Sequence, residues 1–119
     1  NSPPRELYHD RYALLIGASN YRSGWSRLGR VDSELDRLEA ELRRQGFEIE
    51  RLHNPRGDEL YPRIQGFITR RGQPENAILI VFSGHGWTEE RGNDRDWGYV
   101  VPVDAPNPEI DLVGFRRRV

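Results

Sequence analysis

Ala77-Ile78-Leu79-Ile80-Val81-Phe82, followed at once by Ser83-Gly84-His85-Gly86, is the stretch that decides the fold of this chain. Six consecutive apolar residues, several of them β-branched or aromatic, suit a strand covered on both faces, as in the middle of a parallel sheet. His85 would then lie at the carboxyl end of that strand, the edge where open α/β sheets bind ligands. The glycines on either side of it allow close backbone approach and φ values that other residues avoid. The stretch therefore predicts a sheet that presents a histidine at its binding edge.

A second apolar run, residues 12–16, ends in Gly17-Ala18-Ser19-Asn20 and predicts another central strand. Its carboxyl end would deliver the following loop to the same edge as His85. This loop, residues 17–29, is long, is rich in Ser, Arg and Gly, and contains Trp25. Loops of this length within a compact domain are often functional. We therefore expect the loop to contribute to the site.

Helical periodicity follows the first loop. Apolar residues recur at intervals of four, three and four, which predicts an amphipathic helix over residues 31–45: Val31, Leu35, Leu38 and Leu42. Glu39 and Arg43 form an i,i+4 pair in the favourable orientation. Gly46 follows, where a glycine commonly ends a helix.

The remaining elements complete an alternating pattern. Residues 47–52 predict a less buried strand, and residues 58–71 predict a second helix, whose start Pro62 would shift a few residues later. The resulting order is strand, helix, strand, helix, strand. This order implies an α/β fold with a parallel sheet and right-handed crossovers. Further on, residues 88–96 predict a polar loop, and residues 97–104 predict a short strand or hairpin arm.

Length and charge limit the classes of function. A chain of 119 residues can bury one core, and 18 basic residues, all Arg, against 19 acidic ones give a net charge of −1. This balance argues against a nucleic-acid partner held by bulk charge. No stretch approaches the roughly 20 apolar residues of a membrane span, and no signal-peptide pattern is visible, so we expect no membrane partner and a cytoplasmic protein. With no cysteine, the chain has neither disulfides nor thiolate metal sites.

Cofactor motifs are also missing. The segment Gly17-Ala18-Ser19-Asn20 lacks the spaced glycines of a dinucleotide site, and no P-loop is present because the chain has no lysine. Asp94 and Asp96 share a loop, but two carboxylates do not make a calcium site, which needs six to eight oxygens. We predict no cofactor and no metal.

His85 is the strongest candidate for chemistry. An imidazole titrates near neutral pH and can act as a general base and acid. Its place between two glycines at the end of an apolar strand leaves little side-chain packing to explain it. His9, in the polar N-terminal segment, and His53, beside Asn54-Pro55, have no such context, and we interpret both as surface residues.

Four segments carry a resemblance: the first strand ending in Gly17-Ala18-Ser19-Asn20-Tyr21, the helix after Leu28-Gly29, the strand ending in Phe82-Ser83-Gly84-His85-Gly86, and Gly98-Tyr99-Val100-Val101-Pro102-Val103-Asp104. In that order they resemble the N-terminal half of the caspase-like cysteine peptidases, over about residues 11–113. The prokaryotic caspase homologues and the metacaspases are the most similar branch. The resemblance implies a three-layer sandwich with a mostly parallel central sheet. It also implies a bacterial setting in defence or regulated death.

The same resemblance assigns roles to residues. His85 matches the catalytic histidine, and Gly86 matches the residue whose backbone N–H helps form the oxyanion hole. The family's cysteine lies roughly 50 residues after the histidine, whereas only 34 residues follow His85. We therefore expect residues 1–10 to be a tail and residues 11–119 to be the N-terminal, large-subunit-like part of a peptidase domain, with a helix near Ile110 cut short before the cysteine strand.

Three residues are candidates for substrate binding. Arg27 lies where caspases use an arginine to hold an acidic P1 side chain. Ser83 matches the serine that metacaspase-like relatives use with acidic residues to hold a basic P1 side chain. Asp32 falls where those relatives show an Asn-Asp pair, with Ser33 in place of the second member. A solvated loop charge or a helix cap is the alternative for Arg27 and Asp32.

The sequence thus predicts a cysteine endopeptidase in which this chain supplies the histidine of a Cys-His dyad. One alternative is a caspase-like pseudoenzyme that binds peptides or partners without catalysis, and another is a nucleotide- or phosphate-binding α/β domain. We expect two partners: a protein or peptide substrate, and the part of the peptidase domain that carries the cysteine. Because the sheet would stop at its third strand, residues 77–82 should lack a neighbour on one side and pair with a missing segment, a second copy or a separate fragment.

Overall fold

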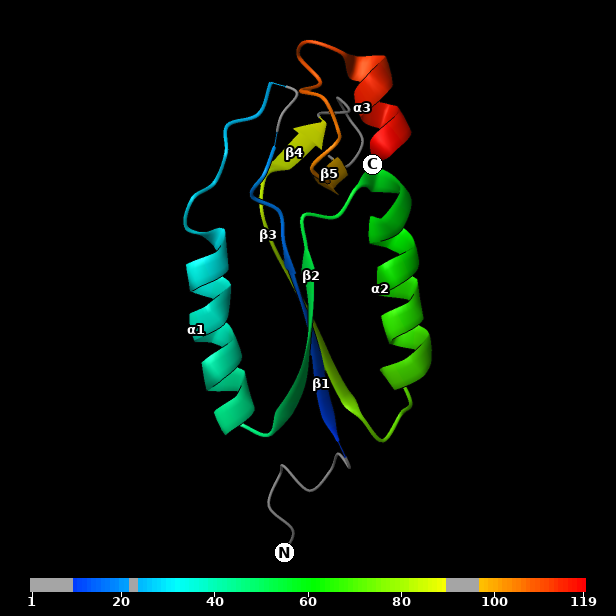
Figure 1. Cartoon of the computed structure of the whole chain (residues 1–119). Helices are drawn as coiled ribbons and strands as arrows, with labels where there is room; N and C mark the ends of the chain where they lie inside the picture. The colour runs from blue at the N-terminus through cyan, green and yellow to red at the C-terminus, as the bar shows by residue number, and fades with distance from the viewer. Residues whose placement is uncertain (1–9, 22–23, 90–96) are drawn as a thin grey trace, which may run out of the picture.

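The computed structural model describes residues 10–21, 24–89 and 97–119. His9, Asp94 and Asp96, together with residues 1–9 of the expected tail, lie outside the described residues. The elements follow the chain as β1 (Arg11–Gly17), α1 (Val31–Arg44), β2 (Phe47–His53), α2 (Gly57–Arg71), β3 (Ala77–Ser83), β4 (Gly86–Glu89), β5 (Trp97–Val100) and α3 (Leu112–Arg118) (Figure 1).

β1, β2 and β3 form a parallel sheet in the order β2-β1-β3. The chain leaves β1 toward β2 and then crosses back over β1 to reach β3. Crossovers of one hand that run in opposite directions place their helices on opposite faces of a sheet. Figure 1 shows α1 and α2 on the two sides of the strands, which gives three layers. The predicted α/β fold is confirmed.

β1 is the centre of the packing. Alternate side chains of a strand point to opposite faces, so Ala13 and Leu15 pack with α1 while Leu14 and Ile16 pack with α2. All four are at most 1% exposed. Buried partners come from both helices and from β2: Val31, Leu35 and Leu42 on one face, and Leu52, Leu60 and Phe67 on the other. The expectation of a central strand over residues 12–16 is therefore confirmed.

β3 does not lie in the middle of the sheet. Within the described part of the chain it pairs with β1 alone, and Ile78 and Leu79 are 38% and 37% exposed on opposite faces. The expectation that this strand is covered on both faces was wrong, because an apolar run shows that a strand is apolar on both faces but not which neighbours cover it. The second expectation, that the strand lacks a neighbour on one side, agrees with this arrangement.

Both long helices begin and end close to the predicted residues. Gly46 follows α1 with a φ of 88°, and its N–H donates to Arg43 O at 3.0 Å, which is the glycine-terminated end that the sequence indicates. α2 begins at Gly57 and contains Pro62, so the expected late start was wrong. Glu59 Oε1 accepts a hydrogen bond from Arg56 N at 3.0 Å at the start of this helix.

A third apolar cluster lies beyond the carboxyl edge of the sheet. Its buried members come from the first loop, from the segment after β5 and from α3: Ala18, Tyr21, Val101, Ala105 and Phe115. β4 and β5 form an antiparallel pair beside it, in agreement with the hairpin arm expected over residues 97–104. α3 follows Asp111, whose Oδ1 accepts a hydrogen bond from Gly114 N at 2.9 Å, close to the helix expected near Ile110. Within the described ranges, no helix has the length and apolar character needed to cross a bilayer.

Candidate active site at the carboxyl edge of the sheet

His85 is the second residue after the end of β3, in the turn that leads into β4. Its imidazole Nε2 is 2.8 Å from the carbonyl oxygen of Ser26, in the loop between β1 and α1. The ring also contacts two aromatic rings of that loop. The ring of Tyr21 stands edge-on with its centroid 4.6 Å away, and the ring of Trp25 is tilted with its centroid 4.9 Å away. The long first loop therefore forms one wall of the site.

The contact with Ser26 selects a tautomer of His85. A carbonyl oxygen only accepts hydrogen bonds, so Nε2 carries the hydrogen when the two atoms are in contact at 2.8 Å. In the neutral imidazole, Nδ1 then holds the lone pair. The orientation leaves Nδ1 as the atom that can accept a proton.

The hydroxyl of Tyr21 joins the histidine turn to a distant segment. It accepts a hydrogen bond from His85 N at 2.9 Å and donates one to Val101 O at 2.6 Å. Burial raises the pKa of Tyr21, so the hydroxyl stays protonated at neutral pH. It can therefore donate and accept at the same time.

The two glycines beside His85 have different roles. Neither has a φ in the left-handed region, so the expectation of unusual backbone angles was wrong. A Cβ at Gly84 would lie 2.7 Å from Tyr21 Oη, whereas a Cβ at Gly86 would meet only Tyr99 O at 3.5 Å. Close approach of Tyr21 therefore explains Gly84, and packing does not explain Gly86.

The N–H of Gly86 is outside the β4–β5 ladder. Gly86 faces Val100 in the antiparallel register, and Val101 N donates to His85 O at 3.0 Å. In such a ladder this bond makes Gly86 and Val100 a pair that exchanges no hydrogen bonds. The Gly86 N–H can therefore serve an acceptor from outside the hairpin.

A hollow of about 300 Å³ lies beside the histidine turn, and residues of the first loop, the start of α1 and the end of β3 line it: Arg27, Leu28, Gly29, Arg30, Val31, Glu34, Ser83 and Gly84. Two of the predicted substrate-binding residues, Arg27 and Ser83, thus share one hollow. Arg27 Nη2 donates to Asn20 Oδ1 at 2.7 Å within the loop.

Asp32, the third predicted residue, is not among the residues that line this hollow. Its Oδ1 is 3.8 Å from Nδ1 of the exposed His53. Glu34 supplies the acidic side chain of the hollow instead. The helical period could not have indicated this, because Glu34, three residues after the buried Val31, and Asp32, three residues before the buried Leu35, lie on the two flanks of the same buried stripe.

No pattern in the sequence indicates a role for Tyr21, Trp25 or Ser26 in contact with His85. Their signal was weak, because two aromatic residues in a long polar loop do not reveal which side chain they will contact. Ser26 acts through its backbone carbonyl, which no residue pattern reports.

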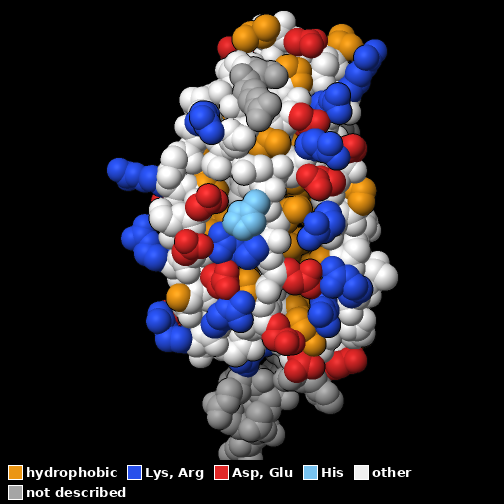
Figure 2. All heavy atoms as spheres, in the orientation of Figure 1, with side chains coloured by type: hydrophobic (Ala, Val, Ile, Leu, Met, Phe, Trp, Pro, Cys, Tyr) orange, Lys and Arg blue, Asp and Glu red, His pale blue; other side chains and the backbone are white. Residues whose placement is uncertain are grey.

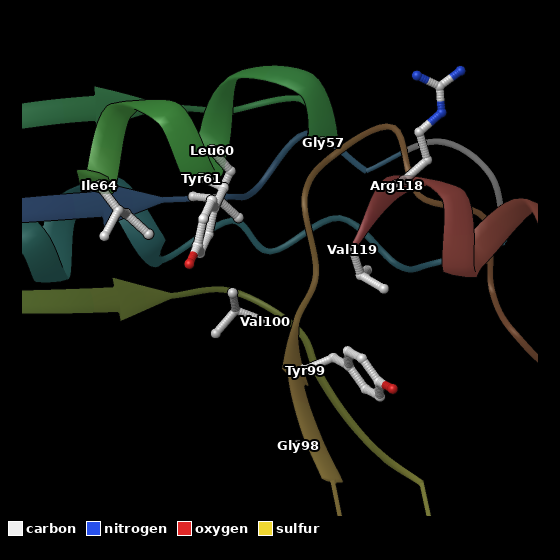
Figure 3. Close-up of a pocket in the computed structure, with 9 residues that line it drawn as sticks. All are labelled: Gly57, Leu60, Tyr61, Ile64, Gly98, Tyr99, Val100, Arg118 and Val119. Atoms are coloured by element: carbon white, nitrogen blue, oxygen red, sulfur yellow. The ribbon is translucent and has the colours of Figure 1, made fainter. Parts of the chain in front are cut away.

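A second hollow, of about 290 Å³, opens between α2, β5 and the end of the chain. In Figure 3 the side chains of Tyr61, from α2, and Val100, from β5, approach from opposite sides. No residue that the sequence singled out as a site residue lines it. Over the described residues, no group of three or more His, Asp or Glu side chains is placed to hold a metal ion.

The fold and the site together define an α/β domain that carries an oriented histidine at the carboxyl edge of a parallel sheet. The model of the caspase domain family matches residues 10–117, and the chain belongs to that family. A comparison with curated proteins found no match. His85 and the residues around it therefore lie within the caspase-domain match, and the 119 residues of this chain include no cysteine.

Proposed function

We propose that this protein acts in peptide-bond hydrolysis as a cysteine endopeptidase of the caspase type, with His85 as general base and acid. The observation that carries this proposal is the orientation of the imidazole, whose Nε2 is engaged by Ser26 O at 2.8 Å while Nδ1 is left to accept a proton. The nucleophile has to come from outside these 119 residues, since they include no cysteine.

In the proposed reaction, Nδ1 of His85 takes the proton of the cysteine thiol, and the thiolate attacks the scissile carbonyl carbon. The imidazolium then gives this proton to the leaving amine as the C–N bond breaks. Water, activated by the same nitrogen, hydrolyses the acyl-enzyme and regenerates the thiol. Ser26 O stabilises the imidazolium throughout, and the Gly86 N–H is a donor for the oxyanion of the tetrahedral intermediate.

The open edge of β3 is the place we propose for the strand that carries the nucleophile. Parallel strands bring their carboxyl ends to the same edge of a sheet, so a strand added beside β3 would end next to His85. Ile78 and Leu79 are partly exposed there and would be covered by such a strand. Whether a continuation of this chain or another chain supplies it does not change the chemistry.

The hollow beside the histidine turn is the proposed P1 pocket. Arg27 would pair with an acidic P1 side chain, whereas Glu34 and Ser83 would pair with a basic one. A charged P1 residue is common to both alternatives. Asp32 keeps only an indirect role in the proposal, because it neighbours α1 residues of the hollow without lining it.

The proposal extends to the prokaryotic and metacaspase branch of the family. Its support is the resemblance of the first-loop segment that ends in Asn20-Tyr21 and of the Ser83-Gly84-His85-Gly86 segment. Within this branch a basic P1 residue is the expected preference.

The test is a cleavage assay on the protein in the form that its own cell produces, with peptides that carry Arg, Asp or Ala at P1. We expect thiol-dependent cleavage after one of the charged residues, and a loss of at least about 100-fold in kcat/KM for His85→Ala, the usual contribution of a general base. Full activity in His85→Ala would exclude the proposed base. Equal cleavage after Ala would exclude the proposed pocket.

The hollow beside the histidine turn would also serve one other function, that of a caspase-like scaffold that binds charged peptides without cleaving them. The same peptides distinguish the two. Binding of a charged peptide that Glu34→Gln or Arg27→Gln weakens, without cleavage in any form of the protein, would support the scaffold. A nucleotide-binding domain is the remaining alternative from the sequence, and a melting temperature that rises with added nucleotide would support it.

A further inference from the structure

Two aromatic side chains of the first loop enclose the imidazole of His85. Tyr21 is 2% exposed and stands edge-on to the ring, and Trp25 is tilted against it. The two aromatic rings also contact each other, with centroids 6.3 Å apart. We call Tyr21 and Trp25 the aromatic clamp.

Each member of the clamp also donates one hydrogen bond to the same downstream segment. Tyr21 Oη donates to Val101 O at 2.6 Å, and Trp25 Nε1 donates to Ala105 O at 3.0 Å. Val101 and Ala105 are fully buried. The rings that contact the imidazole are therefore fixed to a buried backbone segment about 80 residues away in sequence.

The histidine backbone is held by the same segment. His85 O accepts from Val101 N at 3.0 Å, and His85 N donates to the hydroxyl of Tyr21 at 2.9 Å. His85, Tyr21 and Val101 thus form a closed cycle of three hydrogen bonds. Rotation of the histidine backbone would break at least one of them.

Gly84 provides independent evidence that the groups of this hydrogen-bond cycle are tightly packed. A Cβ at Gly84 would lie 2.7 Å from Tyr21 Oη and 2.9 Å from the ring of Phe82. Contacts under 3.0 Å require a shift of one partner. Glycine at this position therefore lets the hydroxyl reach His85 N and Val101 O together.

We propose that Tyr21 and Trp25 are positioning residues for His85, and that the buried segment 101–105 sets the orientation of the imidazole through them. The importance of that orientation for catalysis rests on the proposed function, but the positioning itself does not. Tyr21 acts on the histidine turn, Trp25 acts on the ring, and Ser26, the next residue after Trp25, presents the carbonyl oxygen that Nε2 faces.

The test follows the exchange with water of the His85 Nε2–H and backbone N–H protons by NMR. Tyr21→Phe removes one oxygen and keeps the ring, and Gly84→Ala displaces the hydroxyl without removing it. In both variants we expect the two protons to exchange roughly 2- to 10-fold faster. This is the increase in the population of the open, exchanging state that the loss of one hydrogen bond produces. Tyr61→Phe and Gly66→Ala are matched controls, since Tyr61 is 67% exposed and a Cβ at Gly66 meets nothing within 4 Å.

A role for Tyr21 in stability alone would lower the melting temperature and leave both exchange rates of the folded protein unchanged, and this outcome would overturn the proposal. If neither variant folds, the unaltered protein decides. A nuclear Overhauser effect between the Tyr21 hydroxyl proton and the His85 amide proton supports the cycle, and its absence overturns it. None of these measurements depends on cleavage, so an inactive protein would refute the proposed function without affecting this result.

Discussion

The two outer strands of the sheet, β2 and β3, differ in the side chains that they place at its edges. β2 carries charged side chains that pair with the helices: Arg51 Nη1 contacts Asp36 and Glu39 of α1 at 3.0 and 2.9 Å, and Glu50 contacts Arg70 of α2 at 3.0 Å. Figure 2 shows acidic and basic side chains interspersed over one face of the molecule. β3 carries no charged residue, and Ile78 and Leu79 are partly exposed.

This difference is clearest where the strands are in register. Leu15 of β1 lies between Arg51 of β2 and Val81 of β3. Charged side chains that point inward on an outer strand discourage further pairing, whereas an apolar outer strand invites it. We therefore call β2 the closed edge of the sheet, because its charges disfavour pairing with a further strand, and β3 the open edge. His85 lies on the side of the open edge.

The largest expected effect is a loss of stability from a substitution in β1, the strand that pairs with both outer strands. Leu15 is fully buried, so Leu15→Ala should lower the free energy of unfolding by about 3 kcal/mol. Val81→Ala, one strand outward and only half-buried, should cost about 1 kcal/mol. Urea denaturation measures both. Equal losses would mean that β3 is as well packed as β1 and would remove the contrast between the edges.

The sequence predicts the elements well because their signals are local. Apolar runs mark β1 and β3, a period of 3.6 marks α1, and Gly46 marks its end. Which strand is central depends on contacts between segments far apart in the chain, so the apolar runs predicted two central strands, of which only residues 12–16 are central in the described sheet. The site divides in the same way, since His85 follows from its strand, whereas Glu34 and the aromatic clamp depend on how loop and helix face each other.

The second effect concerns association. With β3 open, we expect the 119-residue chain to self-associate through this edge. Leu79→Lys should weaken that association at least about 30-fold, because burying an unpaired charge in an interface costs 2 kcal/mol or more. Ala40→Lys adds the same charge at an exposed position of α1 and should have no effect. Sedimentation equilibrium measures both, and a chain that stays monomeric at every concentration would contradict the open edge.

The third prediction concerns a substitution that removes charge from β2 and so makes this strand resemble β3. Arg51→Met keeps an unbranched apolar stem but removes both ion pairs with α1. Because replacing a partly buried ion pair by an apolar side chain of similar size is often close to neutral, the free energy of unfolding should change by no more than about 1 kcal/mol. Self-association should increase, since the charge that closes β2 is gone. Unchanged association would show that charge is not what distinguishes the two edges.

The smallest effect is a pH dependence confined to the β2 side. Hydrogen bonds from Arg51 and then Arg43 hold the pKa of Glu39 below its ordinary value of 4.5. A carboxylate whose pKa is lower in the folded protein stabilises it fully above the unfolded value, and this contribution is lost as the pH falls through the folded value. Glu39→Gln should therefore lower the free energy of unfolding at pH 7 by about 0.5 kcal/mol, a small amount because solvent and salt screen the pair.

At pH 3 the difference between the variant and the unaltered protein should be smaller than at pH 7, because protonation of Glu39 in the unaltered protein weakens the contacts that the substitution removes from the variant. Glu75→Gln, an exposed position in the turn before β3, is the control and should change stability at neither pH. Urea denaturation at the two pH values, repeated in 1 M salt, measures the effect. If the difference between Glu39→Gln and the unaltered protein were the same at pH 7 and pH 3, the ion pairs would not be what ties β2 to α1, and packing of the Arg51 stem would have to explain why this edge is closed.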